Sequence, residues 1–312
     1  MLEWSLQGRS RDYIAENSHP KTYRIRAPEL LDFPQKNGYF SVESPIVGRV
    51  TTDPKDVEAG AQLLAAVGKH LKDPQLRAIA TAEVLSKVMA YRDLKKGMEI
   101  LVPSLIPNSS STLHTYVVDD IFDLWGGMPA FALVPQDPTW HHSILLFRGT
   151  DFSLGSGRGW ASLMSDVDTK GPGLKAFRNA QPKLHAWLQR QADQNRKAQA
   201  IGYSLGGVLA TYTAIYEGSL LHDEPMIAFN PPGISAEVND EAERLNIPKE
   251  DIHIYVTQGD IVSKVGKLYG QAFEFSTDQE FRPITAHVDV LCCEPKFYLA
   301  EINLFAENQS RE

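Results

Sequence analysis

The stretch from residue 198 to residue 216 constrains the fold of this chain more than any other. The apolar run AQAIGY leads directly into Ser204, and residues 205–216 continue with apolar side chains at helical spacing. Gly202 and Gly206 stand two positions before and two positions after the serine. A strand that turns sharply into a helix brings the two backbones close together, and glycine permits this because it lacks a Cβ atom. We therefore predict a strand–turn–helix unit with Ser204 at the bend.

Further strand patterns alternate with helical patterns around this unit. Continuous apolar runs suit strands that are buried on both faces of a sheet, and apolar or alternating runs occur at 130–134, 142–150, 225–230 and 251–256. Helical patterns lie at 174–196, where Pro182 predicts a kink or a break, and at 235–246. This alternation predicts an α/β fold with a mostly parallel central sheet flanked by helices. A G-x-S-x-G turn between strand and helix is typical of the α/β-hydrolase fold.

Two helices are predicted ahead of the sheet. Asp53-Pro54 and Asp73-Pro74 each place a capping carboxylate before a proline that suits the first helical turn. Apolar stripes follow both dipeptides, whereas residues 1 to about 50 lack a sustained period and are interpreted as loops and short strands. We expect an N-terminal region, residues 1–110, that packs on or caps a hydrolase domain formed by residues 111–312.

A serine at such a turn becomes a nucleophile when a histidine accepts its proton and an acid orients that histidine. In the α/β-hydrolase fold the acid follows the serine and the histidine comes last. Six of the nine histidines precede Ser204, which leaves His222, His253 and His287. His253 lies inside an alternating strand, and His222 has no plausible acid nearby except Asp223. We therefore predict that His287, which follows several acids, is the base.

The predicted acid is Asp260. It comes just after the strand at 251–256, and Gly259 lets the chain turn there. Catalytic groups of open α/β sheets lie at the carboxyl ends of the strands, which suits this position. Asp278 and Asp289 remain alternatives, although Asp289 follows His287 and would break the expected order. Asp260 could also serve as an ordinary turn residue.

Four motifs together resemble the class 3 lipase family, the fungal-type triacylglycerol lipases and their relatives, over roughly residues 110–290. The motifs are FRGT at 147–150, GYSLGG at 202–207, GDIVS at 259–263, and His287 near the C-terminus. The resemblance implies a serine ester hydrolase whose oxyanion hole uses the backbone amides of Thr150 and Leu205. The Thr150 hydroxyl is an optional further donor in that arrangement.

The same resemblance places a lid at residues 151–166. Gly155, Gly157 and Gly159 would permit hinge motion there, and an ordinary surface loop is the alternative. Two features depart from the family's pattern. Tyr203 stands where many relatives have histidine, and GPGLKAF at 171–177 stands where the family often has a histidine–glycine pair.

Composition narrows the classes of partner. A formal net charge of −8, with no cluster of Lys and Arg, argues against a nucleic-acid binder. No apolar run approaches the roughly 18 residues of a membrane helix, and the first residues lack the apolar core of a secretory signal. The adjacent Cys292 and Cys293 suit neither a disulfide framework nor a zinc site. We expect no metal or organic cofactor, no transmembrane segment, and a protein that is cytoplasmic as synthesised, with export by another route left open.

The predicted activity is hydrolysis of carboxylic esters by acyl transfer through Ser204. The family resemblance favours lipid esters, as a lipase or a phospholipase A1 would cleave, and leaves transient contact with a lipid surface open. A small-substrate carboxylesterase or thioesterase is the enzymatic alternative, because one fold and one triad serve many substrates. A hydrolase fold used only for binding is the non-enzymatic alternative.

Overall fold

The computed structural model describes most of the chain between residues 57 and 290, together with short strands outside that range. The described residues are 24–25, 35–36, 39–43, 46–47, 57–107, 109, 113–124, 128–150, 171–276, 283–290 and 296–302. The predicted lid, the dipeptide Asp53-Pro54, Asp278 and the two cysteines lie outside these residues.

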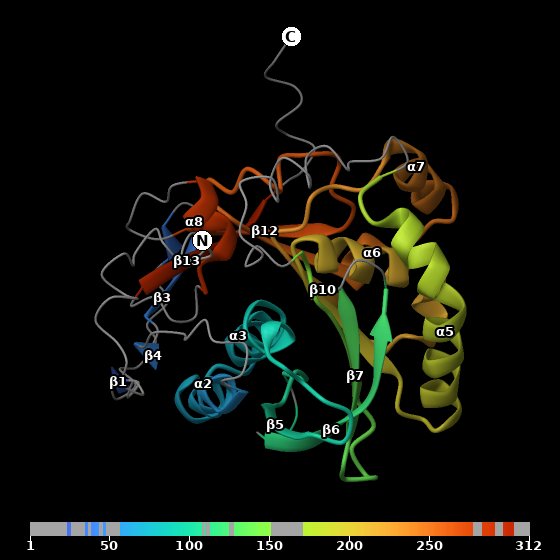
Figure 1. The fold of residues 1–312 in the computed structure, drawn as a ribbon. Coiled ribbons are helices and arrows are strands. Elements are labelled where there is room, and N and C mark those ends of the chain that lie inside the picture. Colours follow the sequence, from blue (N-terminus) through green and yellow to red (C-terminus); the bar gives the residue numbers. More distant parts are fainter. Residues whose placement is uncertain are drawn as a thin grey trace.

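An eleven-stranded sheet organises the molecule, in the order β2-β3-β13-β12-β11-β10-β9-β8-β7-β6-β5 (Figure 1). The five central strands run parallel: β8 (Ser143–Phe147), β9 (Ala198–Tyr203), β10 (Met226–Phe229), β11 (Ile252–Thr257) and β12 (Gln271–Ser276). Antiparallel strands extend both sides: β5 (Glu99–Pro103), β6 (Leu113–Asp123), β7 (Pro129–Pro135), β13 (Lys296–Ile302), β3 (Tyr39–Glu43) and β2 (Gln35–Lys36). A separate two-stranded ladder pairs β1 (Arg24–Ile25) with β4 (Ile46–Val47).

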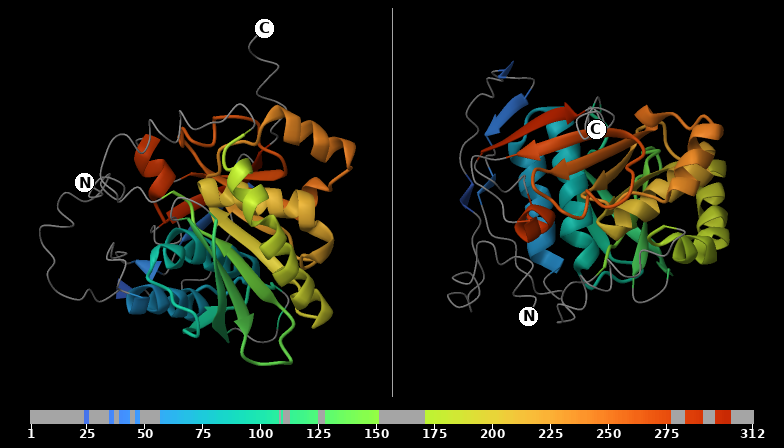
Figure 2. Two further views of the ribbon diagram at one scale, coloured as in Figure 1. Left: turned by 45° about the vertical axis from the view of Figure 1, so that its right-hand side comes forward. Right: turned by 90° about the horizontal axis from the view of Figure 1, so that it is seen from above.

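Helices cover both faces of this sheet, so each face has its own apolar core (Figures 1 and 2). One face packs against α5 (Leu174–Asp193), α6 (Leu205–Glu217) and α7 (Ala236–Arg244). The other packs against α2 (Val57–His70), α3 (Pro74–Lys87) and the short 3₁₀ helix η1 (Met89–Tyr91). Two further 3₁₀ turns, η3 (Gly218–Leu220) and η4 (Lys249–Asp251), connect helices to strands. The predicted α/β-hydrolase fold, with an N-terminal helical region packed on it, is confirmed.

Local sequence signals explain most of these boundaries. Asp73 caps α3 by accepting a 2.8 Å hydrogen bond from the Leu76 amide, and Pro74 occupies the first turn. The predicted break at Pro182 is wrong. The helix α5 runs uninterrupted from Leu174 through Pro182 to Asp193. No helix in the described ranges is both long and apolar enough to span a bilayer.

Parallel central strands decide where chemistry can happen. Because β8 to β11 point the same way, their carboxyl ends meet at one edge of the sheet. The segments that follow these ends carry Thr150, Ser204, Asn230 and Asp260. The short helix α8 (Pro283–Val288) carries His287, which the sequence did not assign to a helix.

Candidate active site

Ser204 stands at the sharp turn between β9 and α6. Its backbone has φ 55° and ψ −129°, a conformation that non-glycine residues seldom adopt. A Cβ atom at Gly202 would overlap the carbonyl oxygen of Gly206, so no side chain fits there. Strained conformations of this kind persist where the surrounding structure holds them, and they cluster at functional sites.

The end of β8 packs directly against this turn. A Cβ atom at Gly149 would lie 2.5 Å from the Tyr203 carbonyl oxygen and 3.2 Å from Ser204 Cβ. Only glycine allows so close an approach. Thr150, the predicted oxyanion residue of this segment, is the next residue after Gly149 and is half-buried.

The start of α6 meets the same strand end. A Cβ atom at Gly206 would lie 2.5 Å from the Phe147 carbonyl oxygen, which shows how closely the helix approaches β8. Leu205 is the first residue of α6. The first amides of a helix have no partner within the helix and lie at the positive end of its dipole, which favours a developing negative charge. Leu205 thus lies where an oxyanion donor would be useful.

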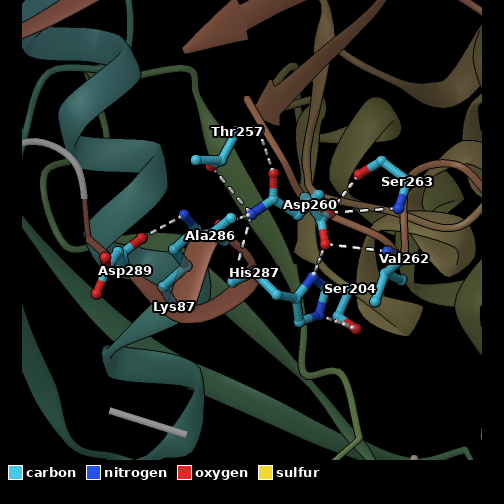
Figure 3. A network of polar contacts seen from close by, with 10 residues as sticks. Lys87, Ser204, Thr257, Asp260, Val262, Ser263, Ala286, His287 and Asp289 are labelled. Carbon is cyan, nitrogen blue, oxygen red and sulfur yellow. Dashed lines mark hydrogen bonds and ion pairs between the residues drawn. The ribbon is translucent and has the colours of Figure 1, made fainter. Parts of the chain in front are cut away.

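The structure also brings His287 to Ser204. His287 Nε2 lies 2.9 Å from Ser204 Oγ, although the two residues are 83 positions apart (Figure 3). Both side chains are fully buried. The Tyr203 ring packs against the His287 imidazole with ring centroids 5.0 Å apart. This contact limits how far the imidazole can move away from Ser204.

Asp260 completes the arrangement from the segment after β11. Its Oδ1 lies 3.1 Å from His287 Nδ1, and Gly259 before it adopts φ 86° to make the turn. Burial opposes ionisation of this carboxyl group. Hydrogen bonds from His287, from the Ser263 hydroxyl and from the Val262 amide outweigh burial and hold the pKa of Asp260 below its ordinary value.

These contacts assign the protons. An ionised carboxylate only accepts hydrogen bonds, so His287 Nδ1 carries the proton that points at Asp260. In the neutral form of an imidazole that is protonated on Nδ1, Nε2 is the acceptor, and here it faces the Ser204 hydroxyl. The three side chains are at most 2 % exposed, and a dry site strengthens interactions between charges.

The other two downstream histidines lie elsewhere. The His222 amide donates to the carbonyl of Ala198 at the start of β9, which places His222 at the opposite edge of the sheet from Ser204. His222 lines a cavity of about 440 Å³ there. His253 lies within β11, where its ring packs edge-on against Tyr255 and Phe273. Neither arrangement involves the Ser204 turn.

Buried histidines away from Ser204 have structural partners. His142 Nδ1 lies 3.2 Å from the Tyr116 hydroxyl, and the His142 ring packs edge-on against His222. Burial lowers the pKa of His142 to about 3, so this ring is neutral.

Within the described ranges no three His, Cys, Asp or Glu side chains group closely enough to hold a metal ion.

Two polar residues near His287 were not predicted from the sequence as part of the site. Asn230 follows β10 with φ 46°, and its side chain bonds to the backbone of His287 and Ala286. Lys87, the last residue of α3, donates to the Asp289 carbonyl oxygen. The position of Asn230 after a central strand was a usable signal, whereas a lysine at a helix end usually faces solvent.

Comparison with known proteins finds similarity to solved structures at low sequence identity. No protein-family model matches the sequence, and no curated protein matches it significantly. A triacylglycerol lipase from Penicillium expansum is 13 % identical, with 52 % of this chain and 70 % of that chain covered and a TM-score of 0.41. Lipase II from Rhizopus niveus is 16 % identical, with 61 % and 73 % covered and a TM-score of 0.40. The Rhizomucor miehei lipase–propeptide complex is 16 % identical, with 88 % and 81 % covered and a TM-score of 0.42. Each of these structures is a lipase to which this chain is similar over part of its length.

Proposed function

We propose that this chain is a serine hydrolase that cleaves carboxylic esters through Ser204, with His287 as the base and Asp260 as the orienting acid. One observation carries the proposal. Two successive hydrogen bonds, of 2.9 Å and 3.1 Å, link the serine hydroxyl to the imidazole and the imidazole to the carboxylate. This is the geometry in which a serine is activated for acyl transfer.

The first half of the reaction forms an acyl-enzyme. Ser204 Oγ attacks the ester carbonyl carbon as His287 Nε2 takes its proton, and the carbonyl oxygen becomes an oxyanion. Asp260, already ionised, stabilises the imidazolium that forms. His287 then returns the proton to the alkoxide leaving group, so that the C–O bond breaks and the alcohol departs.

The second half releases the acid. A water molecule gives its proton to His287 Nε2 and attacks the acyl carbon, and the protonated imidazole then reprotonates Ser204 Oγ. In both halves the amides of Thr150 and Leu205 would donate to the oxyanion. Their value depends on being fixed before the charge develops, and the close packing of the β8 end against α6 supplies that rigidity.

The substrate class follows from sequence. FRGT, GYSLGG and GDIVS resemble class 3 lipase motifs, and on this ground we propose lipid esters as the natural substrates. The family's lid position falls on residues 151–166, which lie outside the described residues.

Steady-state hydrolysis of p-nitrophenyl butyrate by the full chain tests the reaction. Ser204→Ala should abolish activity above background. Ser143→Ala should keep it, because Ser143 is an equally buried serine at the start of β8, at the far edge of the sheet. Unchanged activity in Ser204→Ala would overturn the proposed mechanism.

A series of p-nitrophenyl esters tests the substrate class. A lipid esterase should favour acyl chains of eight or more carbons. A rate maximum at acetate or butyrate, with no gain above the solubility limit of a long-chain ester, would overturn the lipid assignment and leave a small-substrate esterase.

A further inference from the structure

The helix that carries His287 cannot hold its own position. α8 is a six-residue helix, and isolated helices much shorter than about 12 residues are marginal in water. His287 lies in its last turn, so small movements of this segment shift Nε2 relative to Ser204. Contacts from other elements must therefore fix the backbone around residue 287.

One such contact comes from the N-terminal region. Lys87 Nζ donates to the Asp289 carbonyl oxygen at 2.7 Å, two residues beyond His287 (Figure 3). The same ammonium group pairs with Glu83 Oε1 at 3.0 Å, one helical turn earlier in α3. Both side chains of this pair are only 2 % exposed.

The surroundings of Lys87 tie it to the Ser204 turn as well. Its Nζ lies 5.7 Å from the ring centroid of Tyr203 and 5.7 Å from that of Phe229. Tyr203 immediately precedes Ser204 and packs on the His287 ring. The ammonium group thus bridges α3, the strand ends beneath the serine, and the segment after α8.

A second donor acts on the other part of the segment. Asn230 Nδ2 lies 3.1 Å from the Ala286 carbonyl oxygen and 2.9 Å from that of His287. Asn230 Oδ1 accepts the Thr257 amide at 2.7 Å, so the side chain is itself oriented by β11. Two side chains from different elements therefore bind three carbonyl groups between residues 286 and 289.

A buried ion pair calls for a role beyond stability. Withdrawing two charges from water costs about as much as their attraction returns, and well-packed apolar residues often serve as well or better. The Glu83–Lys87 pair is almost fully buried, yet its ammonium group points at a backbone carbonyl next to the proposed base. Orientation of that backbone is a function that an apolar pair could not provide.

We propose that Lys87, held in place by Glu83, is a positioning residue for His287, so that the N-terminal helix α3 is part of the active-site architecture. This inference rests on the proposed function of His287. It predicts that loss of Lys87 lowers kcat, because the imidazole is no longer held in the attacking geometry, and leaves KM unchanged.

Three variants of the full chain separate positioning from stability. Lys87→Met removes the donor but leaves Glu83 buried without this cation, so it loses both stability and kcat. Glu83→Leu combined with Lys87→Met removes both charges; it should recover thermal stability but not kcat, because the Asp289 carbonyl still lacks the donor. Leu85→Ala, a fully buried apolar residue of the same helix, should lose stability but keep kcat.

The expected fall in kcat is about 10- to 100-fold for both Lys87 variants, as for a reacting group displaced by about 1 Å. Recovery of kcat together with stability in the double variant would overturn the proposal. So would an equal fall in Leu85→Ala at matched stability.

A spectroscopic measurement keeps this test independent of the proposed function. The Nδ1 proton shared by His287 and Asp260 should give a downfield proton resonance that disappears in Asp260→Ala. This resonance should broaden or vanish in both Lys87 variants and persist in Leu85→Ala. If the wild type hydrolysed no ester, the proposed function would fail, yet the resonance would still report whether Lys87 positions the ring. An unchanged resonance in the folded double variant would overturn the inference.

Discussion

Replacing Gly206 with alanine should both destabilise the protein and slow its reaction. The added Cβ atom would lie 2.5 Å from the Phe147 carbonyl oxygen and 2.9 Å from the Arg148 carbonyl carbon and the Gly149 amide nitrogen. All three neighbours are backbone atoms at the end of β8, so none can rotate away. The helix start and the strand end must separate.

The contact distances set the size of the effect. Ordinary van der Waals contact begins at 3.4 Å, so from 2.5 Å the Phe147 oxygen must retreat by 0.9 Å. Overpacking of this kind costs about 1–3 kcal/mol of folding stability. The displaced segment leads into Thr150 and the displaced helix begins at Leu205, so we expect kcat to fall about 100-fold as both amides leave their positions.

Urea unfolding followed by circular dichroism, together with p-nitrophenyl butyrate hydrolysis, would measure both effects. Gly218→Ala is the matched control. Gly218 has helical φ −52° and ψ −37° just beyond α6, and an added Cβ meets nothing within 4 Å. This control should keep full activity and gain about 0.4–1 kcal/mol. If Gly206→Ala behaved like Gly218→Ala, the close packing of α6 against β8 would be wrong.

Three further predictions concern the residues around Ser204. Asp260→Asn should lower kcat for the hydrolysis of p-nitrophenyl butyrate about 10⁴-fold, because an amide can hold the imidazole in the wrong tautomer. In the folded protein the pKa of Asp260 is below its ordinary value of 3.8. The ionised carboxylate therefore contributes its full stabilisation above pH 3.8, and this contribution is lost as pH falls through the folded-state pKa. Urea titrations should therefore show the stability gap between wild type and Asp260→Asn narrowing below pH 3.8, and a gap that widened there would contradict the assignment. His222→Gln and His253→Gln should retain kcat/KM, whereas His287→Gln should lose at least about 10⁴-fold; activity that depended on His222 or His253 instead would overturn the choice of base.

The central strands and the serine turn could be predicted because their signals are local. Apolar runs buried on both faces of the sheet, and glycines that the close approach of β9 and α6 requires, are visible in any short window of the sequence. The order of residues along the chain reduced the nine histidines to three, and the structure puts the ring of one of them, His287, next to Ser204.

Long-range pairing could not be predicted in this way. β3, at Tyr39–Glu43, lies beside β13, at Lys296–Ile302, and no local pattern specifies a partner more than 250 residues away. The role of Lys87 was hidden for a related reason. A lysine in the last turn of a helix suits solvent and the helix dipole, and only the packing of α3 against the segment after α8 reveals it as buried.

Mass-spectrometric mapping of a fluorophosphonate adduct on the full chain is the most direct test of an activated Ser204. We predict one adduct, on the Ser204 oxygen, formed with loss of fluoride and at a rate that falls sharply in His287→Ala. An unlabelled protein, or an adduct on a different residue, would contradict the account.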